Sequence, residues 1–216
     1  MSSAAPARPG HNRTRTNWIA PPGPAAAGLR VGLLGGSFNP PHQGHVHASE
    51  LALKRLELDY VWWLVSPQNP LKPERGMESF ERRLEAARDF ARHPKIVVTG
   101  IEKELGTRFT VDALEKLKRR FPHLHFVWLM GSDNLLQIPR WRRWQEIFHL
   151  VPVAVITRPG TALKGRFSKP AARFKAAHRS PDRHFVVTSS PAWTILDGPR
   201  NAMSATALRT GSRSPG

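Results

Sequence analysis

The sequence predicts an α/β domain in which helices cover both faces of a doubly wound, parallel β-sheet. Short runs of apolar, β-branched and aromatic residues alternate along the chain with longer segments that have helical spacing. The runs are apolar throughout, not only at every second position, which is typical of strands buried on both faces. At 216 residues, of which 40% are hydrophobic, the chain is long enough to bury a sizeable core.

The predicted strands are short and are separated by loops or by helical segments. They are rich in Val, Ile, Phe or Trp, residues that favour an extended and buried backbone. The segment 60–65, with two adjacent Trp residues, has this character most strongly. Strands are expected at 31–34, 60–65, 95–99, 125–130 and 151–157, with 185–188 as a sixth candidate.

The segments between these strands have the signals of helices. Ser79 and Thr110 are suitable N-caps, because a hydroxyl oxygen can accept a hydrogen bond from one of the first backbone N–H groups. Phe80 and Leu84 recur on one face of the second segment, and Pro94 ends it. Helices are therefore expected at 46–58, 79–92 and 111–121, and in a stretch that follows the turn at 131–134 and reaches about 148.

The two ends of the chain and one internal segment depart from this alternation. Residues 1–29 hold three arginines, five prolines and no acidic residue, and they lack the apolar run of a secretion signal. We expect a disordered basic tail there, and an Arg-rich targeting segment is the alternative. The folded domain is expected at 30–209, with a long basic loop at 158–183 and a short tail at 210–216.

The net charge of +17 indicates either basic, solvated segments or a polyanionic ligand. Much of the excess lies in the N-terminal tail and the 158–183 loop, not on one regular face. The absence of cysteine excludes structural disulfides and cysteine-based zinc sites, and it is compatible with the cytoplasm, where we expect the protein. The longest apolar runs are too short to span a bilayer, so no membrane contact is expected.

The glycine-rich turn at 35–45 is where we expect the ligand. It reads Gly-Gly-Ser-Phe-Asn-Pro-Pro-His-Gln-Gly-His and joins the first strand to the first helix. In open parallel sheets, ligands bind beyond the carboxyl ends of the strands, and a helix N-terminus offers unpaired N–H groups and positive potential. Phosphate is the natural occupant, although the turn is neither a G-x-G-x-x-G pattern nor a P-loop.

Three interpretations are open for His42 and His45 in this turn. Together with His47 they are closely spaced candidate metal ligands, but Glu50 is the only carboxylate nearby and cysteine is absent. They can also be ordinary loop or core histidines. The interpretation that we favour is a pair of imidazoles that face phosphate, with Gly44 letting the backbone approach the ligand closely.

The turn resembles the G-G-S/T-F-D/N-P-x-H-x-G-H signature of the nucleotidyltransferase superfamily with the HxGH motif, whose members share a Rossmann-like domain. Within it, the chain is most similar to the bacterial nicotinate-nucleotide adenylyltransferases. Asn39 stands where Asp is common, and only seven residues follow Arg209, where relatives usually continue into another helical segment. The resemblance continues in order through Asn69-Pro70-Leu71-Lys72, through 107–114 (T-R-F-T-V-D-A-L), through Gly131-Ser132-Asp133-Asn134 with the Trp-bearing segment 141–144, and through Ser204-Ala205-Thr206-Ala207-Leu208-Arg209.

This resemblance implies that the phosphate of nicotinate mononucleotide attacks the α-phosphorus of ATP, which forms deamido-NAD and pyrophosphate in NAD biosynthesis. The nucleophile is then already an anion, so neither a Ser or Cys nucleophile nor a general base is required. The protein has to hold two anions in line and to stabilise charge on the leaving pyrophosphate. Mg²⁺ is expected to arrive with ATP, held mainly by phosphate oxygens and water, with no metal site formed by protein side chains.

The resemblance also implies roles for individual residues. His45 is the first candidate for transition-state stabilisation, with His42 and Arg209 as further catalytic residues. For Trp141 the alternative is core packing, and for Asp133 it is a simple N-cap of the following helix. ATP is expected to contact Gly35, Gly36, Ser37, Phe38, His42, His45, Gly131, Asp133, Ser204, Thr206 and Arg209, and nicotinate mononucleotide is expected to contact Asn39, Lys72, Thr110 and Trp141.

Two kinds of alternative function remain. The acceptor in the same chemistry can be nicotinamide mononucleotide or phosphopantetheine. In a different class, the charge of +17 suits a nucleic-acid-binding protein, whose binding should depend steeply on salt. That alternative leaves the two histidines and the element at 204–209 without a role, so we expect no nucleic acid partner. Whether the protein is a homo-oligomer is left open.

Overall fold

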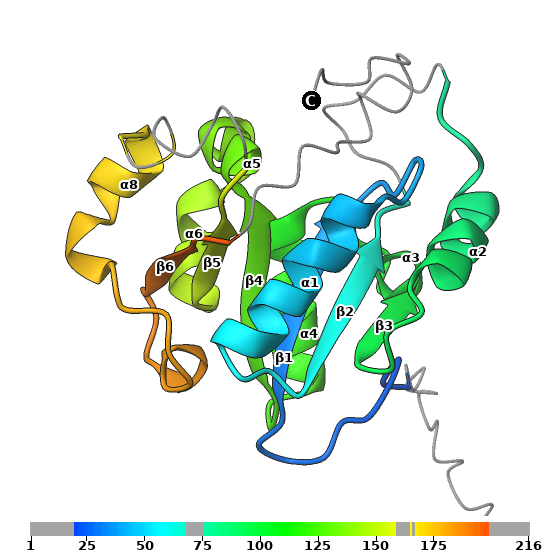
Figure 1. Cartoon of the computed structure of the whole chain (residues 1–216), viewed down its shortest axis with the longest axis horizontal. Helices are drawn as coiled ribbons and strands as arrows, with labels where there is room; N and C mark the ends of the chain where they lie inside the picture. The colour runs from blue at the N-terminus through cyan, green and yellow to red at the C-terminus, as the bar shows by residue number, and fades with distance from the viewer. Residues whose placement is uncertain (1–19, 68–75, 159–164, 166, 199–216) are drawn as a thin grey trace, which may run out of the picture.

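In a computed structural model, which describes residues 20–67, 76–158, 165 and 167–198, the chain forms the expected α/β fold. The described strands make one six-stranded, wholly parallel sheet with the order β3-β2-β1-β4-β5-β6 (Figure 1). The winding reverses between β1 and β4, so the sheet is doubly wound. The strands are β1 (Arg30–Gly36), β2 (Tyr60–Val65), β3 (Ile96–Thr99), β4 (His125–Gly131), β5 (Val153–Ile156) and β6 (Trp193–Leu196).

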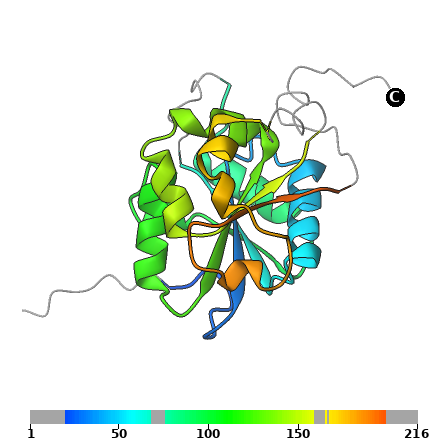
Figure 2. The same cartoon turned by 90° about the vertical axis from the view of Figure 1, so that its left-hand side faces the viewer.

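Helices pack on both faces of this sheet and bury two hydrophobic cores. One core lies between the sheet and α3, α4, α5, α6 and α8, and the other lies between the sheet and α1, α2 and η3. Figure 2 shows the sheet between these layers, with α1 in blue and cyan on one side and the green helices on the other. The helices are α1 (Gln43–Arg55), α2 (Phe80–Phe90), α3 (Ile101–Glu104), α4 (Thr110–Arg120), α5 (Ser132–Gln137), η1 (Ile138–Arg140), α6 (Trp144–Leu150), α8 (Lys169–Arg173), η2 (Lys175–Ala177) and η3 (Phe185–Val187).

The sixth strand does not lie where the sequence predicted it. Residues 185–188 begin with the 3-10 helix η3, because the Asp182 carboxylate accepts the backbone N–H groups of His184 (2.8 Å) and Phe185 (3.1 Å) and closes a turn there. Phe185 is fully buried, so its apolar character reflects core packing and not strand pairing. The strand that pairs with β5 is β6, eight residues further along the chain.

The predicted helix between 131 and 148 is broken into α5, η1 and α6. Pro139 lies in η1 and cannot donate a backbone hydrogen bond, and Arg143 adopts a left-handed backbone conformation (φ +50°) just before α6. The short helix α3 was not predicted, because four residues carry too little periodicity to be recognised. The break matters for the site, since it exposes the segment 140–142 between two helices.

The predicted basic loop at 158–183 contains folded structure, which corrects that prediction. Ser168 caps α8, where its hydroxyl accepts the N–H of Ala171 (3.4 Å). Phe174 stacks on Phe148 with ring centroids 4.4 Å apart, and its carbonyl accepts the indole N–H of Trp193 (2.8 Å). The segment therefore closes one end of the hydrophobic core.

The folded part of the chain also begins earlier than residue 30. The N–H of Gly28 donates to the carbonyl of His123 (2.8 Å), and the His123 ring lies 2.9 Å from the carbonyl oxygen of Ala25. Residues 20–29 of the expected disordered tail are thus packed beside the start of β1. The predictions for 1–19 and 210–216 concern residues outside the described part. Within the described ranges, no helix has the length and apolar character needed to cross a membrane.

Candidate active site

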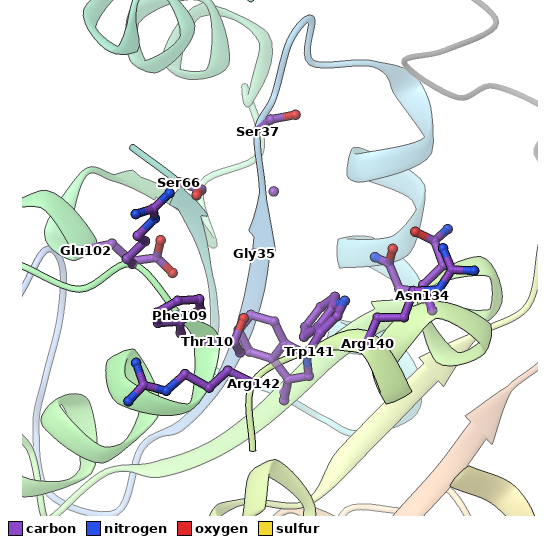
Figure 3. A pocket seen from close by; sticks show the side chains of 14 residues that line it. Gly35, Ser37, Ser66, Glu102, Phe109, Thr110, Asn134, Arg140, Trp141 and Arg142 are labelled. Atoms are coloured by element: carbon purple, nitrogen blue, oxygen red, sulfur yellow. The ribbon is translucent and has the colours of Figure 1, made fainter. Parts of the chain in front are cut away.

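A cavity of about 200 Å³ opens where β1, β2 and β4 end, next to the reversal in the winding of the sheet (Figure 3). This is the position at which open parallel sheets bind ligands. The end of β1 supplies its back wall with residues 35–37, and the residues around the start of α4 supply a second wall with 108–110. Residues 140–142, exposed by the break after η1, form the facing wall. Ser66, Glu102, Trp128, Asn134 and Gln137 complete the lining.

The N-terminus of α1 directly follows the same turn and is capped by the two histidines of the turn, His42 and His45. The N–H of Gly44 donates to Nδ1 of His42 (3.1 Å), and the N–H of His42 donates to Nδ1 of His45 (3.2 Å). The two rings lie with their centroids 3.8 Å apart. Because each Nδ1 accepts a backbone hydrogen, each neutral ring carries its own hydrogen on Nε2. The helix cap therefore fixes both imidazoles in the tautomer that presents an Nε2–H donor.

The position of His45 is fixed further by aromatic packing. The centroid of its ring lies 4.6 Å from that of the Phe38 ring. The Phe38 ring in turn stacks on Trp63, with ring centroids 4.9 Å apart. Phe38 has a positive φ of 47°, a conformation that costs a non-glycine residue free energy and persists where packing determines it. The Ser49 hydroxyl donates to the carbonyl of His45 (2.8 Å) and accepts from Nε1 of Trp63 (2.8 Å). These contacts leave the imidazole little freedom.

Arg83 of α2 joins the loops that follow β1 and β2. Its guanidinium donates to the carbonyls of Ser37 (2.6 Å), Ser66 (2.8 Å) and Pro67 (2.9 Å), and its Nε donates to that of Glu78 (3.0 Å). The side chain is buried, and this burial lowers its pKa. The sequence carries a signal for this burial, because Arg83 lies at helical spacing from Phe80 and Ala87 and so falls on the face of α2 that packs against the core.

Arg143 fixes the facing wall of the cavity. Its guanidinium lies 2.6 Å from the carboxylate of Glu115 and 3.5 Å from that of Asp112, both on α4, and it also pairs with Glu146. These partly exposed ion pairs tie the segment between η1 and α6 to α4. Trp141, two residues before Arg143, lines the cavity and also packs against the adjoining core. Trp141 thus shows the core packing expected as the alternative and also lines the cavity in which the acceptor is expected.

Gly131 and Asp133 form a separate cluster with Arg158 at the end of β4. The guanidinium of Arg158 lies 3.4 Å from both carboxylate oxygens of Asp133, and its backbone N–H donates to the hydroxyl of Ser132 (2.9 Å). A Cβ atom on Gly131 would lie 2.3 Å from the Asp133 carboxylate, so a larger residue there would require the Asp133 side chain to shift. The N-cap of α5 is Gly131, and the interpretation of Asp133 as the N-cap is wrong.

The structure thus brings some of the expected ligand-binding residues together and separates others. Asn39 does not line the cavity: its amide donates to the carbonyl of Gly76 (3.2 Å) and accepts the N–H of Glu78 (3.3 Å), so it braces the turn. The expected residues that line the cavity are Gly35, Gly36, Ser37, Thr110 and Trp141; Phe38, His42, His45, Gly131 and Asp133 lie outside its lining, and Lys72, Ser204, Thr206 and Arg209 fall outside the described residues.

Glu102 of α3 is a cavity residue that the sequence did not single out. The residue is only 8% exposed, although it belongs to the lining of the cavity. Burial raises the pKa of Glu102 to about 7, because the charged form loses its hydration. No spacing signal marks a lone glutamate in a four-residue helix, so only the three-dimensional structure reveals it.

This raised pKa predicts a pH-dependent difference in stability between the protein and its Glu102→Gln variant. The folded state holds the proton more tightly than the unfolded chain, so stability is fully present below the ordinary glutamate pKa and falls as pH rises to about 7. Relative to the variant, the protein should lose on the order of 3 kcal/mol between pH 4 and pH 8. Urea unfolding of both proteins at several pH values measures the difference, and two parallel stability curves would contradict it.

The chain matches a family model over most of its length, and about half of its aligned residues are identical to those of relatives that share one description. Residues 33–211 match the model of the family described as cytidylyltransferase-like. A protein of Parvibaculum lavamentivorans is 52% identical over 84% of this chain and 92% of its own length, and one of Methylorubrum extorquens is 50% identical over 84% and 100%. Both are described as probable nicotinate-nucleotide adenylyltransferase.

Solved structures show a similar fold. Plasmodium falciparum nicotinic acid mononucleotide adenylyltransferase, complexed with NaAD, superposes with a TM-score of 0.64 at 16% identity, covering 84% of this chain and 83% of that one. The same enzyme complexed with APC gives a TM-score of 0.61 over the same shares of both chains. At this identity the likeness concerns the arrangement of helices and strands.

Proposed function

The chain belongs to the cytidylyltransferase-like family, in its nicotinate-nucleotide adenylyltransferase branch, and we propose that it transfers the adenylyl group of ATP to nicotinate mononucleotide. The products are deamido-NAD and pyrophosphate, and the reaction is a step of NAD biosynthesis. The observation that carries this proposal is the turn after β1, which leads from the back wall of an aromatic and cationic cavity into a histidine-capped helix N-terminus.

The helix N-terminus suits the phosphates of ATP. The positive end of the α1 dipole attracts an anion, and the Nε2–H groups of the two histidines that cap this helix add donors to it. Residues 35–38 run between this terminus and the cavity, so a ligand along the turn can extend from one to the other. The chemistry needs an aligned pair of anions and charge stabilisation on the leaving group, both of which preorganised donors supply.

The cavity suits the pyridine nucleotide. Phe109 and Trp141 offer flat apolar surfaces from opposite walls, and Arg108, Arg140 and Arg142 bring positive charge to its lining. The guanidinium of Arg142 lies 4.9 Å from the centre of the Phe109 ring, which holds that arginine beside the aromatic surface. A planar ring with an anionic substituent and a phosphate matches these surfaces.

Replacement of Trp141 by alanine is expected to raise KM for nicotinate mononucleotide about three- to tenfold, because it removes a stacking surface worth about 0.5–1.5 kcal/mol. KM for ATP should change much less, and Trp141→Phe should restore part of the loss. Initial rates with each substrate varied in turn separate the two constants. An equal rise in both KM values would show that Trp141 supports the fold and does not contact the acceptor.

Several parts of this proposal concern groups outside the described residues. Ser204, Thr206 and Arg209 are proposed to bind the distal phosphates of ATP, and Lys72 is proposed to contact the acceptor.

Mg²⁺ enters with ATP as an ion bound mainly to phosphate oxygens and water. The cytoplasm is the proposed location.

The experiment that tests the proposed function is an acceptor panel with the full-length chain. Pyrophosphate release from ATP is followed with nicotinate mononucleotide, nicotinamide mononucleotide and phosphopantetheine in parallel, and deamido-NAD is identified by mass. We expect the highest kcat/KM with nicotinate mononucleotide and one pyrophosphate for each deamido-NAD. Turnover with phosphopantetheine alone, or salt-dependent binding of polynucleotide without any turnover, would refute the proposal.

A further inference from the structure

Glu102 is a buried acidic side chain that lines the cavity and forms no hydrogen bond or ion pair through its carboxyl group with the described residues. The backbone around it is fixed. The N–H of Ile101 donates to the hydroxyl of Thr99 (3.1 Å), and the Thr107 hydroxyl donates to the carbonyl of Glu102 (3.2 Å). Figure 3 shows the carboxyl group on the wall that also carries Phe109 and Thr110. A buried polar group without a protein partner indicates a ligand partner.

The charged groups on neighbouring elements of the described chain form no ion pair with the carboxyl group of Glu102. Lys103, next to it on α3, pairs with Glu81 of α2 at 2.7 Å. Lys116 of α4 donates to the carbonyl of Leu105 (2.6 Å). Glu104 on the same helix is exposed, and the arginines of the cavity at 108, 140 and 142 form no ion pair with Glu102. Burial therefore raises the pKa of this carboxyl group, and no neighbouring positive charge among the described residues lowers it again. The neutral form is populated at neutral pH.

A neutral carboxyl group and an ionised one prefer different ligands. The neutral form has an O–H that can donate to a carboxylate, whereas the ionised form repels a carboxylate and attracts a cation. The two candidate acceptors differ in this respect. The nicotinate ring carries a pyridinium charge and a carboxylate, with a net charge of zero, and the nicotinamide ring carries the pyridinium charge alone.

We propose that Glu102 determines which pyridine nucleotide the cavity accepts: in its neutral form it donates a hydrogen bond to the nicotinate carboxylate, and in its ionised form it disfavours that substrate relative to nicotinamide mononucleotide. This inference rests on the proposed function and adds a specificity-determining residue to it. Glu102 takes no part in the bond-forming step. Its effect on specificity depends on its state of protonation.

The consequence is a preference that changes with pH. As pH rises through the pKa of Glu102, the form that binds nicotinate is lost, and the ratio of kcat/KM for nicotinate mononucleotide to that for nicotinamide mononucleotide falls. The ratio should fall about tenfold or more between pH 6 and pH 8.5. Ionisation of the substrate phosphates, of ATP and of the histidines affects both acceptors alike and cancels in this ratio.

The test measures this ratio across that pH range in the full-length protein and in two variants. Glu102→Gln keeps a hydrogen-bond donor and cannot ionise, so its ratio should stay high and be independent of pH. Glu104→Gln, an exposed change on the same helix, should keep the pH dependence of the unmodified protein. Nicotinamide mononucleotide is followed both as an acceptor and as a competitive inhibitor, so that the comparison survives slow turnover.

The outcomes separate this inference from the proposed function. A ratio that is flat or rises with pH in the unmodified protein, or an unchanged slope in Glu102→Gln, would overturn the role of Glu102 while turnover of nicotinate mononucleotide leaves the function standing. Absence of turnover with either acceptor at every pH would refute the function itself. The unmodified protein alone shows whether the kcat/KM ratio falls with pH. The inference can therefore be tested even if a variant does not fold.

Discussion

Replacement of His45 by alanine is expected to lower kcat about 10²- to 10³-fold, the usual cost of removing one preorganised donor from developing charge. The ring is fixed by the His42 N–H and by Phe38, so its Nε2–H needs no reorganisation when the pyrophosphate leaves. KM for both substrates should change by a smaller factor, because the donor acts chiefly in the transition state. Steady-state rates of pyrophosphate release measure both constants.

Two further variants separate chemistry from folding in this experiment. His45→Gln retains a side-chain acceptor for the N–H of His42, as in a capping box, so it should recover most of the stability and little of kcat. His47→Ala changes a histidine two residues further along α1, outside the cap, and should leave kcat nearly unchanged. Near-normal turnover by folded His45→Ala protein would show that the imidazole has no part in catalysis.

Replacement of Arg83 by methionine is expected to lower the free energy of unfolding by about 2–4 kcal/mol. Four backbone carbonyls lose their donor, and that of Ser37 lies in a buried part of the turn. The loop at the back wall of the cavity should then move, which raises KM for both substrates. Chemical denaturation and steady-state kinetics measure the two effects.

The neighbouring Arg82 provides a matched control for that variant. Its guanidinium is exposed and lies 3.6 Å from the carboxylate of Glu78, an ion pair on the surface of the protein. Arg82→Met should therefore change the free energy of unfolding by no more than about 0.5 kcal/mol. If Arg83→Met and Arg82→Met unfold at the same denaturant concentration, the buried hydrogen bonds of Arg83 do not hold the loops.

Most of the sheet could be predicted because its strands are continuous apolar runs. The bounds of β2 agree with the prediction at both ends, and β1, β3, β4 and β5 lie at the predicted places with shifts of a few residues. The sixth strand was misplaced because 185–188 and β6 are equally apolar, and only tertiary pairing distinguishes a strand from a buried 3-10 turn. The break near Pro139 has a local cause, because proline cannot donate a backbone hydrogen bond. It was not predicted, because the helical spacing of the surrounding residues indicated one continuous helix.

The candidate site could be predicted where one short motif determines the local structure. The turn that leads from β1 to α1 holds both histidines in a cap, and its first residues line the cavity together with Thr110 and Trp141. Arg83 and Glu102 were missed because their surroundings come from distant parts of the chain. The acceptors of Arg83 include carbonyls 16 and 46 residues away, and the burial of Glu102 depends on the packing of several elements.

The most direct measurement of the central claim is a crystal structure of the full-length chain with its product, deamido-NAD. We expect the diphosphate within hydrogen-bond distance of the α1 N-terminus and of Nε2 of His45. The pyridine ring should lie in the cavity beside Trp141, with its carboxylate on the side of Glu102. Product bound elsewhere on the molecule, or with its diphosphate away from α1, would contradict the account.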